Sequence, residues 1–374
     1  MPGPADERVR AAWARVAHSP ALSADALVLA LARAGGLESL LAAPHEHLPA
    51  RLARQLLQVR DADLGASLAW LDSPGHALLP CLAASYPELL RAVPGAPAVL
   101  WVSGDVSALA AAQLAIVGSR QPTPTGREIA VEWAGALARA GLVVTSGLAS
   151  GIDAAAHRGA LAAGGRTIAV CATGLDRCYP PAHAGLAAAI AAQGALVSEF
   201  APGTAARAGN FPRRNRILAG LALGTLVVEA AERSGSLITA RLAGEYGRAL
   251  CAIPGSIRNP MARGCHALLR RGARLVESPA DVLAALGRTA YAPAEYVQSA
   301  APSGAPALDK AGEILLDALG FEPADLDTLV TRTGFSAQTV SSTLLILELQ
   351  GRVEPHAGRY CRAAAAPTTR LNCR

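Results

Sequence analysis

Lysine is almost absent from this chain of 374 residues: Lys310 is the only one, so nearly all of the 34 basic residues are arginines. A GC-rich genome explains this bias, as it explains the abundance of alanine, glycine and proline. The arginine excess alone therefore does not establish an anionic partner. The net charge of +5 and the pI near 9.0 permit one, and what matters is where the arginines cluster.

Other features that would define a class of protein are also missing. No apolar run reaches about 18 residues without a charge or a turn-forming residue, so we expect no transmembrane helix. Residues 1–10 are charged and lack an apolar core, so we expect no secretory signal. The seven cysteines form no CxxC pair and are odd in number, which favours reduced thiols over disulfides or a zinc site. We therefore predict a cytoplasmic protein without a membrane partner, a metal or another cofactor.

Length and hydrophobicity indicate a folded chain of two or three domains. Hydrophobic residues make up 52% and charged residues 17%, so a large core can be buried. Within residues 1–75, apolar residues recur at helical spacing between Pro and Gly breaks. This pattern predicts a small helical N-terminal domain of the SAM-like type.

Residues 76–287 alternate between short apolar runs and amphipathic segments. The alternation predicts βαβ units, and hence an α/β Rossmann-like domain with a mainly parallel sheet covered on both faces. The predicted strands are 78–82, 98–102, 114–119, 142–146, 167–172, 195–200, 225–230, 249–253 and 274–277. The predicted helices are 126–140, 152–163, 182–192, 212–221, 237–246 and 265–270. Sheets of this kind bind ligands outside the carboxyl ends of their strands.

The C-terminal part has a different pattern. Residues 288–306 are rich in Ala, Pro, Ser and Tyr without a period, which predicts a linker. Three helical segments and a hairpin-like stretch within 307–363 outline a winged helix, and 364–374 is predicted to be a disordered tail. The third helix would be the recognition helix of a duplex-binding protein, but no arginine lies between Phe335 and Gln350. We therefore expect weak duplex binding there.

The first candidate binding motif is Gly118-Ser119-Arg120, at the end of a predicted strand. Gly118 permits a sharp turn, and Ser119 and nearby backbone N–H groups can face an anion. Arg120 would project from the carboxyl edge of the sheet. A plain turn with a solvated arginine is the competing interpretation, and the spacing alone does not decide between them.

The second motif is a glycine-rich turn before a helix, which could cradle a phosphate through Ser146, Gly147, Ser150 and Gly151. It is neither GxGxxG nor a P-loop. Ser150 and Asp153 have the spacing of a capping box, so helix capping is the preferred role of Asp153. His157 follows on the same helix face, and we expect a packed or hydrogen-bonded histidine. A Ser–Asp–His hydrolase is disfavoured because no GxSxG elbow is present.

The third motif carries Phe211, Arg213, Arg214, Asn215 and Arg216. Pro212 suits the first turn of a helix, and three arginines crowd that turn. Positive charge is unfavourable at a helix N-terminus, so the arginines make sense if an anion lies against them. Phe211 could stack on a base, as in single-strand binders.

Internal neutralisation is the competing interpretation of these arginines. Glu199, Glu229 and Glu232 are the available acids, and we expect one pairing, of Arg216 with Glu229. A fourth motif, Ser234-Gly235-Ser236, follows the strand that carries Glu229. It is first a helix-capping signal, and it also offers hydroxyls and N–H groups on the same edge of the sheet.

Taken together and in order, these stretches resemble the DNA-processing protein A family (DprA, also called Smf). The resemblance spans about residues 78 to 286 and continues more loosely into the winged helix. It rests on VGSR at 117–120, SGLASGID at 146–153 with His157, GLD at 174–176 with Tyr179-Pro180, FPRRNRI at 211–217, Glu229-Ala230, SGS at 234–236 with Thr239-Ala240, and Pro254-Gly255.

The resemblance implies a non-catalytic protein that binds single-stranded DNA, protects it and helps load RecA recombinase onto it during natural transformation. It also implies a homodimer formed through the Rossmann-like domain. Arg120 and residues 211–216 match family positions around the basic DNA pocket. Many relatives carry a basic residue directly after the Tyr-Pro pair, where this chain has Pro181.

Two other functions remain open. Gly224-Thr225 and Glu229 partly match the motif of a nucleotide-binding Rossmann enzyme of the phosphoribohydrolase (lysine-decarboxylase-like) type, but its double glycine is absent and no acid, base and nucleophile converge. A duplex-binding regulator is the second alternative, and the neutral recognition helix argues against it. Tight binding of single strands with little sequence preference would distinguish the leading hypothesis from both.

Overall fold

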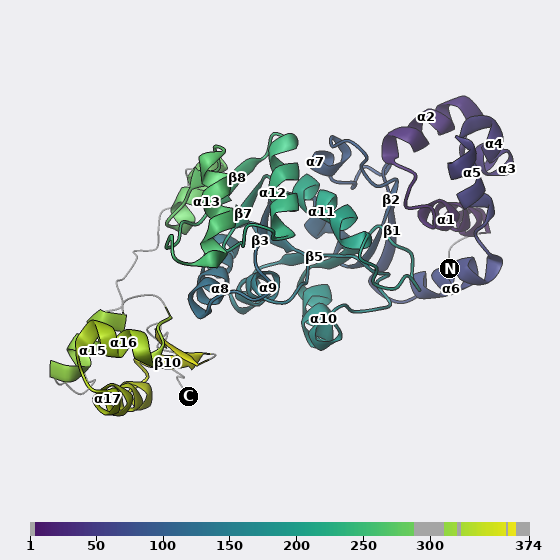
Figure 1. Ribbon diagram of the computed structural model, residues 1–374. Helices are drawn as coiled ribbons and strands as arrows, with labels where there is room; N and C mark the ends of the chain where they lie inside the picture. Colours follow the sequence, from purple (N-terminus) through teal and green to yellow (C-terminus); the bar gives the residue numbers. More distant parts are fainter. Residues whose placement is uncertain (1–3, 288–309, 320–322, 357, 364–374) are drawn as a thin grey trace. The chain divides into compact units, whose positions relative to one another are not determined.

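The computed structural model describes residues 4–287, 310–319, 323–356 and 358–363 (Figure 1). The chain divides near residue 291 into two compact units. The predicted linker 288–306 and the predicted tail 364–374 lie outside the described residues.

A nine-stranded sheet forms the centre of the larger unit. In spatial order its strands are β1 (His76–Pro80), β2 (Val99–Gly104), β6 (Ala195–Ser198), β5 (Thr167–Cys171), β4 (Val143–Ser146), β3 (Gln113–Val117), β7 (Gly224–Val227), β8 (Ala249–Ala252) and β9 (Arg274–Leu275). The pairs β1–β2 and β2–β6 are antiparallel, and all pairs from β6 to β9 are parallel. The predicted mainly parallel sheet is confirmed.

The strand order reverses direction at β3, because β4, β5 and β6 follow on one side of it and β7, β8 and β9 on the other. The loops after β3 and β7 therefore leave the sheet toward opposite faces and open a crevice between them. This switch point is where open α/β sheets bind their ligands.

Helices cover both faces of the sheet (Figure 1). In Figure 1, α8 (Pro124–Arg139), α9 (Ile152–Ala162) and α10 (Ala184–Gln193) lie below the sheet, and α11 (Asn210–Leu221) and α12 (Ser236–Glu245) lie above it. Leu114 and Ile116 of β3 belong to the core formed with Trp133 of α8, whereas Val117 belongs to the core formed with Ile217 of α11. Alternate residues of a strand thus face opposite layers, which explains why the strands are apolar throughout. Further helices are α7 (Glu88–Arg91), α13 (Arg263–Arg270) and α14 (Pro279–Ala285).

The N-terminal helices share a core with the sheet. They are α1 (Pro4–Ala17), α2 (Ala24–Ala34), α3 (Leu37–Ala42), α4 (Pro44–His47), α5 (Ala50–Leu57) and α6 (Asp61–Leu71). Leu22 and Leu27 are fully buried in the same cluster as Tyr86 and Trp101. The imidazole of His18 meets the Trp101 ring edge-on at 6.2 Å between centroids. The helical layer is therefore packed directly against β2.

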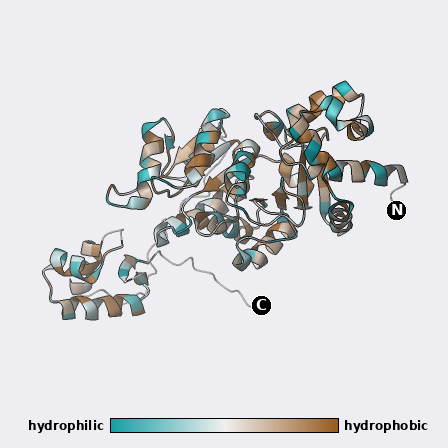
Figure 2. Cartoon of the chain, turned by 45° about the vertical axis from the view of Figure 1, so that its right-hand side comes forward, coloured by the Kyte–Doolittle hydropathy of each residue, from teal (hydrophilic) through white to brown (hydrophobic). Residues whose placement is uncertain are grey.

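The smaller unit has the predicted winged-helix elements. They are α15 (Lys310–Leu319), α16 (Leu326–Thr333), α17 (Ala337–Leu349), β10 (Val353–His356) and β11 (Arg359–Arg362). Leu315, Leu329, Val340 and Leu344 form its buried core. Figure 2 shows that its helices carry both brown hydrophobic and teal hydrophilic residues, as amphipathic helices do. None of the helices in the described ranges is long and apolar enough to cross a membrane.

Candidate nucleic-acid interface

A cavity of about 850 Å³ opens at the switch point, between the loops after β3 and β7 and the start of α11. The predicted residues that line it are Gly118, Ser119, Arg120, Asp153, Phe211, Arg214, Asn215, Ser234, Gly235 and Ser236. The predicted residues outside its lining are Ser146, Gly147, Ser150, Gly151, His157, Arg213, Arg216 and Glu229. Gln121 and Arg233 line it without having been predicted, although each is the direct neighbour of a predicted motif.

The Gly118-Ser119-Arg120 turn forms one wall of the cavity. A Cβ on Gly118 would lie 2.6 Å from Cγ1 of Ile152 and 2.8 Å from the carbonyl oxygen of Glu229, so only glycine fits there. The Ser119 amide donates to that same Glu229 carbonyl at 2.7 Å, so this N–H group is not free for an anion, whereas Ser119 itself lines the cavity. Arg120 is exposed, and it makes no ion pair with the described residues. Its guanidinium carbon lies 5.4 Å from the ring centroid of Phe211.

The glycine-rich turn after β4 holds a carboxylate of the protein itself. The Oδ2 atom of Asp153 accepts hydrogen bonds from the amides of Gly147 at 3.1 Å and Ala149 at 3.4 Å. The N-cap of α9 is Gly151, which makes no side-chain cap bond, so the predicted capping box of Ser150 and Asp153 is wrong. The Gly147 amide of the predicted phosphate cradle and the neighbouring Ala149 amide are therefore already occupied by an internal anion.

Arg214 is the buried cation of the cavity. Only 4% of the residue is exposed, and its Nε and Nη1 atoms have no hydrogen-bond partner in the described part of the chain. A Cβ on Gly147 would lie 1.4 Å from that Nη1, so the absence of a side chain at Gly147 makes room for the guanidinium. Burial lowers the pKa of Arg214 and raises the pKa of Asp153, and the attraction between the two opposes both shifts.

His157 is a structural histidine, as predicted. It is fully buried, and its Nδ1 lies 2.7 Å from Oγ1 of Thr167. Because the Thr167 hydroxyl donates to the Val144 carbonyl at 2.6 Å, the Nδ1–H of His157 donates to Thr167. Burial, with smaller contributions from Arg214 and His183, lowers the pKa of His157 to about 3. The ring is therefore neutral and links α9 to β5.

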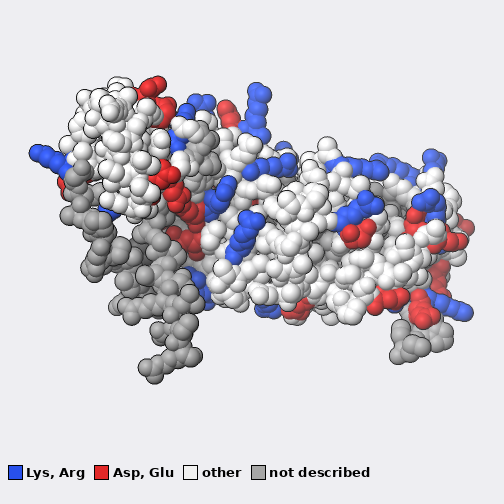
Figure 3. All heavy atoms as spheres, turned by 90° about the horizontal axis from the view of Figure 1, so that it is seen from below, with Lys and Arg blue, Asp and Glu red and all other residues white. Residues whose placement is uncertain are grey.

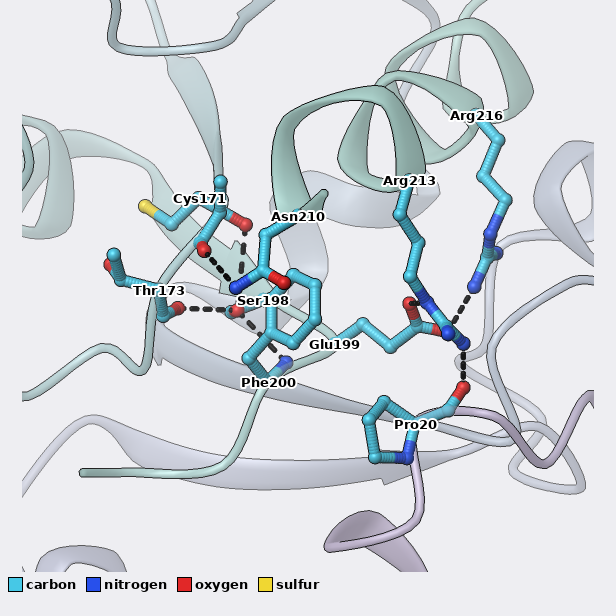
Figure 4. A network of polar contacts seen from close by, with 10 residues as sticks. Pro20, Cys171, Thr173, Ser198, Glu199, Phe200, Asn210, Arg213 and Arg216 are labelled. Atoms are coloured by element: carbon cyan, nitrogen blue, oxygen red, sulfur yellow. Dashed lines mark hydrogen bonds and ion pairs between the residues drawn. The ribbon is translucent and has the colours of Figure 1, made fainter. Parts of the chain in front are cut away.

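The other two arginines of the third motif share one carboxylate inside the protein (Figure 4). The carboxylate of Glu199, of which only 2% is exposed, pairs with Arg213 at 2.6 Å and also with Arg216. Arg213 additionally donates to the carbonyl of Pro20 in the N-terminal helical layer. The predicted pairing of Arg216 with Glu229 is wrong, because β6 brings Glu199 beside α11 instead. Of the three clustered arginines, only Arg214 lines the cavity.

Glu229 has a different partner. Its carboxylate accepts from the Thr123 amide at 2.8 Å and from the Thr123 hydroxyl at 2.6 Å. The same hydroxyl accepts from the Gly126 amide at 3.0 Å and caps α8. Glu229 thus fastens the start of α8 to the end of β7 and supports the cavity wall.

The Ser234-Gly235-Ser236 segment forms the opposite wall. Gly235 is the N-cap residue of α12 and makes no side-chain cap bond, so the simple capping interpretation is incomplete. Instead, the Ser234 hydroxyl lies 2.7 Å from the Ser236 hydroxyl and accepts from the Ser236 amide at 3.3 Å. The neighbouring Arg233 is exposed on the same rim.

On the face drawn in Figure 3, arginine side chains are spread over the surface, with acidic side chains among them. The predicted neutral surface of α17 is also present in the smaller unit, where Leu345, Ile346 and Leu349 are 57%, 50% and 81% exposed. An exposed apolar helix face is suited to protein contacts more than to a phosphate backbone. The residues of the cavity are therefore the best candidates for binding an anion.

Comparison with known families matches both units of the chain. Residues 77–287 match the family described as DNA recombination-mediator protein A, and residues 299–359 match the DprA winged helix domain. Protein Smf of Escherichia coli is 41% identical over 324 residues, covering 85% of this chain and 86% of that protein. DNA processing protein DprA of Streptococcus pneumoniae is 42% identical over 236 residues, covering 63% of this chain and 82% of that protein.

Solved structures agree with the sequence matches. The X-ray structure of DNA processing protein A from Streptococcus pneumoniae aligns with a TM-score of 0.64 at 37% identity, covering 72% of this chain and 95% of that one. A structure of DNA processing protein A from Helicobacter pylori, reported for its single-stranded DNA binding mode, aligns with a TM-score of 0.52 at 28% identity. It covers 57% of this chain and 96% of that one.

Proposed function

The chain belongs to the DNA recombination-mediator protein A family, and from this premise we propose that it binds single-stranded DNA in the switch-point cavity without cleaving it. The observation that carries the proposal is Arg214, a residue of the cavity lining whose buried Nε and Nη1 atoms are unpartnered among the described residues. A buried charge without hydrogen bonds is costly, and for Arg214 the cost of burial outweighs the attraction of Asp153, so an anion in the cavity would stabilise the guanidinium. A backbone phosphate oxygen supplies that anion.

The rest of the cavity suits a nucleic acid strand. Arg120 adds an exposed second cation on the rim, and Arg233 adds a third. Phe211 is half-buried beside Arg120 and presents an aromatic ring to the same space. Cations interleaved with aromatic rings bind single strands with little sequence preference, because every base has a face that can stack. A stacked duplex offers no such free base faces, so the site favours single strands.

A binding role fits the cavity better than catalysis. The hydroxyls of Ser119, Ser234 and Ser236 line it, but no histidine is among the lining residues to accept their protons. Its carboxylate, Asp153, is occupied by two backbone amides. The alternative, a phosphoribohydrolase acting on nucleotides, would release a free base from a nucleoside monophosphate, and chromatography of the incubated nucleotide tests it.

We extend the proposal to the cellular role. The protein protects incoming DNA and loads RecA recombinase in natural transformation or recombination, in the cytoplasm and as a homodimer. Family membership supports the recombination role, and the exposed edge strand β9 with Leu275, 50% exposed, supports self-association. Within this scheme, residues 76–287 form the DNA-binding domain, 1–75 a helical support and 307–363 a winged helix for protein contacts. RecA filament assembly on protected single strands, with and without the protein, tests the loading step.

The central test is binding of a labelled oligo-dT strand across a salt series, with the matching duplex as control. The wild type should prefer the single strand, with a slope of log affinity against log salt near −0.7 for each phosphate neutralised. Arg120→Ala should weaken binding and flatten the slope. Arg241→Ala, which removes an exposed arginine of α12 outside the cavity lining, is the matched control and should bind as the wild type does. Absence of single-strand binding by the wild type at low salt would refute the proposal.

A further inference from the structure

We propose that Tyr179 is a nucleobase-stacking residue that extends the single-strand site beyond the cavity, along the loop after β5. This inference rests on the proposed function and adds a residue and a contact type to it. Tyr179 does not line the cavity itself, and its side chain is uncharged, so it is not recognisable as a phosphate contact. The reason to include Tyr179 is that its ring lies beside the ring of Phe211, which does line the cavity.

The exposure of Tyr179 is unusual for this protein. The ring is 48% exposed, and of the Phe, Tyr and Trp side chains in the described ranges it is the only exposed one. Its hydroxyl has no hydrogen-bond partner among the described residues. About half of this residue is open to solvent, and so is the space in which a ligand could contact the ring. The ring is therefore available for a ligand.

Tyr179 continues the line of groups that begins at the cavity rim. The guanidinium of Arg120 lies 5.4 Å from the Phe211 centroid, and the Phe211 and Tyr179 centroids are 5.6 Å apart with their planes tilted by 56°. Both separations are within the range of favourable cation–ring and ring–ring contacts. A cation followed by two aromatic rings can hold a base of one nucleotide and then a base of the next.

The loop that carries Tyr179 is braced on both sides. Before it, the Thr173 hydroxyl donates to the carbonyl of Arg177 at 3.1 Å, and Asp176 Oδ1 accepts from the Gly203 amide at 2.8 Å. After it, the buried His183 donates from Nδ1 to the Leu148 carbonyl at 2.9 Å. A stacking platform held in place in the free protein loses little conformational entropy when a base binds.

The test compares Tyr179→Ala, Tyr179→Leu and Tyr179→Phe with the wild type, using labelled oligo-dT and a strand of equal length made of abasic sites. On oligo-dT, Tyr179→Ala and Tyr179→Leu should weaken binding about 5- to 30-fold, and Tyr179→Phe should bind as the wild type does. The salt slope should stay unchanged in all three, because no phosphate contact is lost. On the abasic strand the four proteins should bind alike.

The outcomes separate the two proposals. If Tyr179→Ala binds oligo-dT as tightly as the wild type while Arg120→Ala does not, the stacking role is wrong and the cavity site stands. If Tyr179→Ala weakens both strands equally, the residue supports the loop and does not contact a base, which overturns the inference. If Tyr179→Leu retains full affinity, bulk rather than an aromatic face is what matters, and stacking is again refuted. A wild type that binds neither strand removes both proposals.

Discussion

Gly147→Ala provides the sharpest test of the role of Arg214, because it displaces the guanidinium from its position without removing it. The added methyl group would lie 1.4 Å from Nη1 and 2.3 Å from Cζ of Arg214, far inside any allowed contact. The backbone at Gly147 does not have a positive φ, so the strain falls on the side chain contact alone. The guanidinium must leave its position, and the open cavity gives it space to do so.

The expected effect on DNA binding is larger than the effect on folding. Loss of one hydrogen-bonded contact between an arginine and a phosphate costs about 1.5–3 kcal/mol, which is about 10- to 150-fold in affinity. The salt slope should become shallower by about 0.7, the contribution of one phosphate on a single strand. Overpacking at a site with a mobile neighbour should lower the free energy of unfolding by only about 1 kcal/mol.

Binding titrations with oligo-dT at four salt concentrations, together with urea denaturation, measure both effects. Gly244→Ala is the matched control, because a methyl group there meets nothing within 4 Å, and it should leave binding unchanged. The double variant Gly147→Ala/Arg214→Ala should bind no more weakly than Arg214→Ala alone, since both act through the same guanidinium. Wild-type affinity and slope in Gly147→Ala would refute the reasoning, as would additive losses in the double variant.

Three further predictions concern the scaffold. Because the pKa of His157 is lowered to about 3 from 6.5, the unfolded chain binds a proton between these values that the folded chain does not, and stability should fall by about 2 kcal/mol from pH 7 to pH 5. His157→Gln should abolish this part of the pH dependence in urea denaturation, and an unchanged dependence would contradict the assignment. Glu199→Gln should destabilise the protein by about 3–5 kcal/mol, because Arg213 and Arg216 lose their shared carboxylate, and a thermal midpoint within a degree of the wild type would exclude this. Gly159→Ala should lower the free energy of unfolding by about 1–3 kcal/mol and leave oligo-dT affinity unchanged, since its methyl group would lie 2.1 Å from the Val131 carbonyl of α8.

The sheet could be predicted because its strands are buried on both faces. β3 and β5 are buried at every position, so each appears in the sequence as a short apolar run between amphipathic helices. The carboxyl edge of the sheet then places the loops after β3 and β7 together, which is why Gly118-Ser119-Arg120 and Ser234-Gly235-Ser236 line one cavity.

The partners of the charged groups could not be predicted, because they depend on the order of strands in space. Glu199 and Glu229 are both candidates for Arg216 in the sequence, and only the position of β6 beside α11 selects Glu199. Asp153 has the correct spacing for a capping box with Ser150. Its carboxylate instead accepts a hydrogen bond from the Gly147 amide, in the turn before α9. Neither distinction is visible in residue spacing.

The shared core between the helical layer and the sheet determines where the chain can be cut. A fragment beginning at residue 76 would leave Trp101 without its cover from the helices, and Arg213 would lose the carbonyl of Pro20. The start of α11, which sets Phe211 and Arg214 at the mouth of the cavity, would lose that tether. The helices before β1 therefore hold the binding face in position, and a fragment intended to isolate that face should include α1.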